Sequence, residues 1–158
     1  MRNLNLIPAD PGITTLRSNL LGELQVRATD VLTFPAGMLG FPECRRFALL
    51  RGERERLYWL QSAEYPTLVF LLVDPFLIDS GYSLDVQPSQ IVELGSAELS
   101  DIGLLAVVTL PADRGLAPTV NLQAPIVINF KTRCAKQLVT GDDQFSVRRP
   151  VDLSLLVA

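Results

Sequence analysis

Short apolar segments, separated by turn residues, are the feature that most constrains the fold of this chain. We predict strands at residues 14–20, 24–26, 31–34, 47–50, 57–62, 68–73, 104–110, 126–130 and 136–140. Their spacing leaves no room for repeated crossover helices, which excludes a doubly wound α/β fold. Strands this short must hide their edges. We therefore predict a mainly β fold, either a small antiparallel β-barrel or a strongly curled sheet, with one or two short helices.

One window favours a helix, and the chain length favours a single domain. Pro88 begins a turn with a short apolar face that Gly95 ends, and a second turn is expected near residues 97–102. The 158 residues fit one folding unit. We place that domain at residues 14–150, with a flexible N-terminal arm at 1–13 and a C-terminal tail at 151–158.

Composition narrows the classes of partner. The net charge is −3, and the basic residues are scattered apart from Arg51, Arg54, Arg56 and the pair Arg148-Arg149, so we expect no direct binding of nucleic acid. The longest apolar stretches hold six and seven residues, whereas a membrane-spanning helix needs about 20. The two cysteines form no CxxC pair, and the first residues lack the pattern of a signal peptide. We expect a cytoplasmic protein.

The sequence offers little catalytic chemistry. It contains no histidine, the side chain that titrates nearest neutral pH and the commonest metal ligand. GxSxG, GxxxxGK[ST] and GxGxxG motifs are also absent. The carboxylates that could pair, Asp74, Glu98 with Asp101, and Asp142-Asp143, are in turn-like, solvated contexts. Cys134 lies near Arg133 and Lys136, but no base is beside it in the sequence, which favours an inert thiol. We expect no catalytic residue, metal or cofactor.

Several ordered blocks resemble one protein family. They are LTFPAGMLGFP at residues 32–42, WLQSAEYP at 59–66, DPF at 74–76 and NLQAPIVIN at 121–129, followed by KTR at 131–133 and FSVR at 145–148. Together they resemble the FliW family of flagellar assembly factors, over roughly residues 14–150. The chain departs from the family pattern at Ala36, where an acidic residue is usual, and at Arg149, where a histidine is common.

The resemblance implies a function in protein binding. Members of the family bind the translational regulator CsrA, which relieves its repression of flagellin mRNA, and they also bind flagellin. Secretion of flagellin then frees the factor to capture CsrA. This partner switch requires neither catalysis nor a cofactor.

We select candidate protein-binding residues from the matching blocks and their flanks: Phe34, Pro35, Gly37, Gly40, Phe41, Gln61, Glu64, Asn121, Pro125, Asn129, Lys131 and Arg148. Aromatic residues dominate binding hot spots, but core packing is the favoured alternative for Phe34 and an equal one for Phe41. The glycines supply special backbone angles, and the asparagines commonly satisfy backbone groups in turns. If a barrel forms, rim loops at 35–42, 61–66 and 121–125 are hypothesised to gather on one side.

A different class of function remains open. A small β-barrel ligand-binding protein or enzyme would have a sizeable internal cavity lined by a few polar groups. No polar residue recurs on the apolar faces of the predicted strands, which favours a filled interior instead. A structural flagellar subunit is disfavoured because the chain has neither heptads nor a long terminal helix.

Overall fold

The computed structural model describes residues 12–95, 98–113, 115–141, 143–152 and 154. The strands are β1 (Ile13–Ser18), β2 (Gly22–Arg27), β3 (Val31–Thr33), β4 (Arg46–Arg51), β5 (Leu57–Ser62), β6 (Val69–Val73), β7 (Ile102–Thr109), β8 (Thr119–Asn129), β9 (Cys134–Gln137) and β10 (Arg149–Pro150). The α-helices are α1 (Pro75–Ile78) and α2 (Pro88–Ile91). The 3-10 turns are η1 (Ala28–Asp30), η2 (Val92–Leu94) and η3 (Leu99–Asp101).

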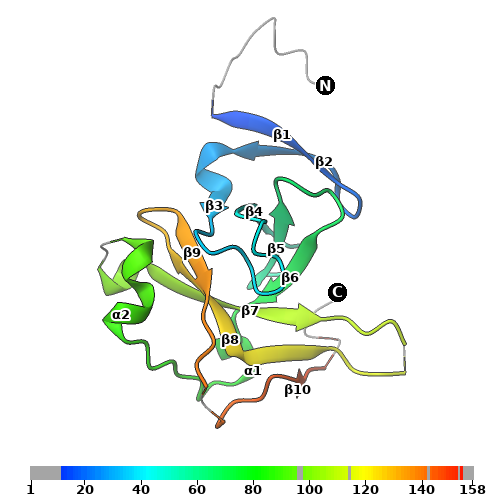
Figure 1. Cartoon of the computed structure of the whole chain (residues 1–158). Helices are drawn as coiled ribbons and strands as arrows, with labels where there is room; N and C mark the ends of the chain where they lie inside the picture. The colour runs from blue at the N-terminus through cyan, green and yellow to red at the C-terminus, as the bar shows by residue number, and fades with distance from the viewer. Residues whose placement is uncertain (1–11, 96–97, 114, 142, 153, 155–158) are drawn as a thin grey trace, which may run out of the picture.

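Seven strands close into a barrel. Their order is β8-β7-β6-β5-β4-β3-β9, and β9 pairs again with β8. Every neighbouring pair is antiparallel except β3 and β9, which run parallel with Thr33 opposite Cys134. The hairpin of β1 and β2 forms a separate two-stranded sheet above the barrel (Figure 1). The predicted mainly β, barrel-like fold is confirmed.

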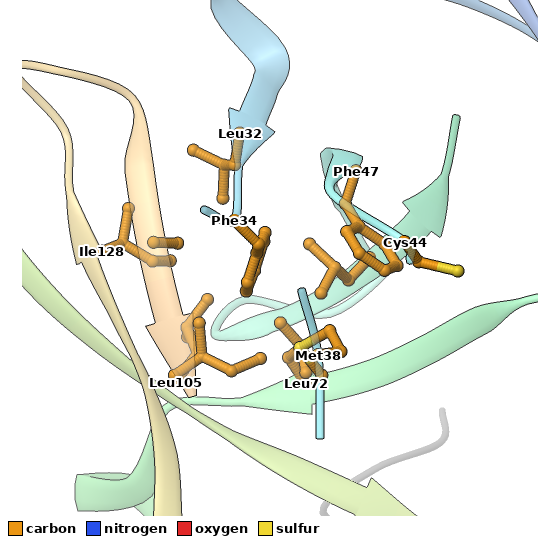
Figure 2. Close-up of a cluster of buried hydrophobic side chains, with 11 residues drawn as sticks. Leu32, Phe34, Met38, Cys44, Phe47, Leu72, Leu105 and Ile128 are labelled. Atoms are coloured by element: carbon orange, nitrogen blue, oxygen red, sulfur yellow. The ribbon is translucent and has the colours of Figure 1, made fainter. Parts of the chain in front are cut away.

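The barrel interior is filled with side chains. Leu32, Phe34, Phe47 and Leu60 are fully buried, and the rings of Phe34 and Phe47 meet edge to face at 5.1 Å between centroids. Figure 2 shows Phe34 among leucine and isoleucine side chains from neighbouring strands. Such aromatic pairs add to the stabilisation from apolar burial.

A second core lies beside the barrel, where β7, β8 and β10 extend past it. Tyr82 packs on Phe145 with ring centroids 4.8 Å apart, and Leu122 and Val151 are buried in the same cluster. The N–H of Val151 donates to the carbonyl oxygen of Pro118. Val151 is therefore packed in this second core, although the sequence predicted that the C-terminal tail begins at this residue.

Strand β8 contains a wide bulge. Leu105 pairs with Ile126 and Val107 with Asn121, so that residues 122–125 of β8 lie opposite Ala106 alone. The side-chain Oδ1 of Asn121 accepts hydrogen bonds from the N–H groups of Gln123 and Ala124. Pro125 has no N–H to leave unpaired. The strand thus bends without orphaned donors, and its two halves pair with β10 and β9 respectively.

Most elements lie where the sequence placed them. The strand at 57–62 is confirmed to the residue, and the helical window at 88–94 is α2 followed by η2, ended by Gly95 at φ +91°. The interpretation of 121–125 as a rim loop was wrong, because these residues belong to β8. Helix α1 and strand β10 were not predicted. Of the predicted N-terminal arm, residues 1–11 lie outside the described part of the chain. Across that part, no helix has the length and apolar character needed to cross a membrane.

Candidate functional site

The loop between β3 and β4 is built around two glycines with left-handed backbone angles. Gly37 has φ +71° and Gly40 has φ +85°. Met38 and Phe41 form an isolated bridge in which each N–H donates to the other's carbonyl oxygen, at 3.2 and 2.8 Å. A Cβ on Gly37 would lie 2.5 Å from the carbonyl oxygen of Pro42, whereas one on Gly40 would meet nothing within 4 Å. The loop is tightly folded, and Gly37 is indispensable to its shape.

The two phenylalanines of this loop have different environments. Phe34 is fully buried, so its side chain is not available to a partner, and its selection as a binding residue is corrected to core packing. Phe41 is half-buried and contacts Phe70 edge to face at 5.9 Å. Pro35 is half-buried as well. Leu39 is the large apolar residue exposed in this loop, at 53%, and it was not among the residues selected from the sequence.

Gln61 and Glu64 hold the loop between β5 and β6. Gln61 is fully buried, and its Nε2 lies within 3.1–3.5 Å of the carbonyl oxygens of Ser62, Tyr65, Pro66 and Leu68. This role is structural, which corrects its selection as a surface contact. Glu64 forms an ion pair with Arg46, at 3.3 Å between Oε2 and Nε, and accepts a hydrogen bond from the Arg46 N–H.

The asparagines also serve the backbone. Asn129 is fully buried; its Nδ2 donates to the carbonyl oxygen of Leu94 and its Oδ1 accepts from the N–H groups of Lys131 and Thr132. Asn121 organises the β8 bulge in the same way. Pro125 is buried, and its carbonyl oxygen accepts from the N–H of Leu138. Asn129 and Pro125 are buried, and the half-buried Asn121 uses its side-chain oxygen for the backbone of the bulge, so all three serve the local structure.

The candidate residues do not form one site. The β3–β4 loop, the β5–β6 loop and the β8 bulge lie at one end of the barrel, which we call the loop end: Phe47 at the start of β4 pairs with Ser62 at the end of β5, and the N–H of Ala63 donates to the carbonyl oxygen of Arg46. Gln137 links two of them, since its Oε1 accepts from the Leu39 N–H at 3.4 Å and its Nε2 donates to the carbonyl oxygen of Ala124 at 3.1 Å. Lys131 is exposed at the opposite end, in the turn between β8 and β9. Arg148 is exposed beside β10.

Several exposed apolar side chains lie at the loop end, as others do on α1, η2 and the β7–β8 loop. Leu39, Tyr65 and Val139 are 53%, 47% and 56% exposed, and they come from the β3–β4 loop, the β5–β6 loop and the segment after β9. Large exposed apolar residues of this kind contribute strongly when a partner buries them. Only the folded chain brings them to one end, so the sequence pattern gave no signal for them.

A groove of about 1180 Å³ lies at the opposite end of the barrel. Its walls come from β2 and η1, the end of β4, the starts of β5 and β7, the end of β8 and the turn after it, α1 with the preceding Asp74, and the segment at 84–91. That segment is fixed to the barrel because Lys136 Nζ lies 2.6 Å from Glu93 Oε1 and 2.9 Å from the carbonyl oxygen of Gln90. The sequence did not indicate this groove, since its residues come from many separate elements.

One cysteine is shielded below the loop end. Cys44 is 1% exposed, and burial, together with the negative charges of Glu43 and Glu64, raises the pKa of its thiol. A raised pKa lowers the fraction of the nucleophilic thiolate at neutral pH. Cys44 therefore belongs to the core and offers no reactive group.

Comparison with known proteins identifies the family. The family model described as FliW protein matches residues 15–151. The chain belongs to the FliW family. It is 38% identical over 131 residues to the flagellar assembly factor FliW of Pseudothermotoga lettingae, which covers 83% of this chain and 84% of that relative. It is 33% identical over 137 residues to the FliW of Leptospira interrogans, covering 86% and 91% respectively.

The fold agrees with that membership. A crystal structure of the flagellar assembly factor FliW superposes with a TM-score of 0.78 at 28% identity, covering 87% of this chain and 96% of that one. Both departures from the FliW pattern are visible in the present structure. Ala36 is exposed in the β3–β4 loop. Arg149 pairs with Asp79, at 3.2 Å between Nη1 and Oδ2, which joins β10 to the end of α1.

Proposed function

We propose that this member of the FliW family is a non-enzymatic, cytoplasmic assembly factor that binds CsrA, relieves repression of flagellin mRNA, and exchanges CsrA for flagellin. The observation that carries the proposal is the family match over residues 15–151 together with the shared fold. The exposed apolar residues of the loop end support a role in protein binding.

The alternative of a barrel that carries a small molecule in its lumen is disfavoured. That alternative requires a cavity along the barrel axis with a few polar groups. Fully buried side chains, among them Leu32, Phe34, Leu60 and Ile128, occupy this space instead. The large groove lies at one end of the barrel, where it is open to solvent.

The test is a calorimetric titration with CsrA and with monomeric flagellin, followed by addition of flagellin to the preformed CsrA complex. We expect saturable binding of both proteins and displacement of CsrA by flagellin. Absence of a complex with either protein would overturn the proposal. Simultaneous binding of both would overturn the exchange while leaving each interaction in place.

A surface variant locates the contact. Leu39→Glu places a charge at an exposed position in the β3–β4 loop. It is expected to lower the affinity for at least one of the two partners about tenfold. Val92→Glu is the matched control, because Val92 is 73% exposed in η2, at the other end of the barrel and outside the groove lining. Equal affinities of the two variants for both partners would exclude the loop end from the interface.

A further inference from the structure

The groove opposite the loop end has the dimensions and lining of a peptide site. Its volume of about 1180 Å³ exceeds the range of roughly 300–1,000 Å³ usual for small-molecule pockets. Half-buried apolar side chains line it, among them Leu49, Leu84, Val86, Ile91, Ile102 and Leu104. They come from the barrel on one side and the segment at 84–91 on the other. A helix with an apolar face fits such a lining.

Two exposed phenylalanines border this lining. Phe76, in α1, is 46% exposed, and Phe130, after β8, is 41% exposed. A Cβ on Gly103 would lie 2.5 Å from Cε2 of Phe130, so the glycine leaves the space in which this ring lies against β7. A held, exposed aromatic ring offers a large contact area at a small entropic cost on binding.

Three arginines and three aspartates line the groove, so its formal charge is balanced and its preference depends on which of these groups are already paired. Arg27, Arg51 and Arg133 line it, and among the described residues none of them has a carboxylate partner within 4.0 Å. The guanidinium of Arg133 lies 6.0 Å from the centre of the Phe130 ring. Guanidinium groups bind carboxylates with two parallel hydrogen bonds, so these side chains favour an acidic ligand.

The acidic residues of the groove are already engaged. Asp30 accepts a hydrogen bond from the Arg27 N–H, at 3.0 Å. Asp74 accepts from the Phe76 N–H and lies 3.9 Å from Nε of Arg56, which is outside the lining. Asp85 accepts from Nε2 of Gln87. The carboxylates therefore have donors, whereas the three arginines are available to a partner's carboxylates.

We propose that this groove binds an amphipathic α-helix of a protein partner, with the apolar face of the helix on the groove lining and its acidic flanks on Arg27, Arg51 and Arg133. The inference rests on the proposed function, because it assigns a binding surface to one of the partners. A helix with side chains is about 10–12 Å wide and rises about 5.4 Å per turn, so a groove of about 1180 Å³ holds roughly two turns.

The direct test uses synthetic peptides and the full-length chain. The probe is a labelled helical peptide of about 18 residues, with leucines spaced i, i+3, i+4 and i+7 and glutamates on both flanks. Its controls are a scrambled peptide and a twin with lysine in place of glutamate. Fluorescence anisotropy should show binding of the acidic peptide at least about tenfold tighter than of either control, weakening as salt is raised.

Variants of the protein locate the binding. We expect R27E/R51E and Phe130→Ala each to lower the affinity for the acidic peptide about tenfold. R17E/R148E is the matched control for the double variant, since Arg17 and Arg148 are exposed, lie outside the groove lining and give the same charge change. Circular dichroism verifies that each variant is folded. Failure of the acidic peptide to bind, equal binding of the lysine twin, or no loss in both groove variants would overturn the inference. Binding of dodecanoate in place of the peptide would overturn it in favour of a small-molecule site.

The same variants separate this inference from the proposed function. Unchanged affinity of R27E/R51E and Phe130→Ala for CsrA and for flagellin would overturn the groove assignment and leave the partner exchange intact. Binding of the acidic peptide without binding of either protein would overturn the exchange and support the groove. Loss of one partner only, in both groove variants, would identify the protein that supplies the helix.

Discussion

At the scale of single residues, Gly37 and Gly40 look alike in the sequence but differ in what surrounds them. Both have positive φ, which costs a residue with a side chain about 1–2 kcal/mol. Gly37→Ala also forces its Cβ against the backbone of Pro42, and we expect that overpacking to add about 1–3 kcal/mol. Urea denaturation should therefore show a larger loss of stability for Gly37→Ala than for Gly40→Ala. Equal losses would contradict the crowded geometry of the loop.

The two cysteines should differ in reactivity. Cys44 is shielded from solvent, whereas Cys134 is only half-buried. The raised pKa of the Cys44 thiol also lowers its fraction of reactive thiolate at pH 8. With an aromatic disulfide reagent we expect two phases, the slower by about tenfold or more because Cys44 reacts through local opening. Cys44→Ala should remove the slow phase and Cys134→Ala the fast one. The reverse assignment would contradict the burial of Cys44.

At the scale of elements, Asn129 joins the end of β8 to η2. In Asn129→Ala the Leu94 carbonyl loses one hydrogen-bond donor, and the N–H groups of Lys131 and Thr132 lose their acceptor. We expect the free energy of unfolding to fall by about 2–4 kcal/mol. Asn121→Ala disturbs only the half-buried bulge and should cost about 1–2 kcal/mol.

Hydrogen exchange distinguishes these two variants further. Amides at residues 88–95 should exchange faster in Asn129→Ala, because the Leu94 carbonyl then keeps only the Thr132 hydroxyl as a side-chain donor, and remain unchanged in Asn121→Ala. Faster exchange there in both variants would show that the effect spreads through the whole sheet.

The limits of prediction from the sequence also lie at this scale. The strand at 57–62 was predictable because turn residues bound a short run of apolar and aromatic residues. The first half of β8 was not, since Asn121 and Pro125 are typical of turns and here build a bulge within a strand. Gln61 is polar, yet it is buried to satisfy loop carbonyls, a use that only tertiary structure reveals. The groove depends on elements far apart in the sequence, so local patterns carried no trace of it.

At the scale of the whole molecule, the barrel closes through one narrow seam. The parallel contact between β3 and β9 has a single residue pair, Thr33 with Cys134, and the Thr33 N–H donates to the carbonyl oxygen of Arg133 at 2.9 Å. The adjoining antiparallel contacts, of β3 with β4 and of β8 with β9, have three and four pairs. The seam is therefore the place where a small change can open the barrel.

Thr33→Pro tests the seam, because proline removes the N–H that points to β9. We expect a loss of about 2–4 kcal/mol in the free energy of unfolding, since the closing bond goes and the shared core is opened. Opening would expose the edges of β3 and β9, which favours association between molecules, visible by light scattering during size-exclusion chromatography. Thr33→Val keeps both the N–H and the β-branched shape and is the matched control. If the proline variant were as stable and as monomeric as the valine variant, the barrel would be held by its antiparallel contacts and core alone, and the β3–β9 seam would be a consequence of closure and not its cause.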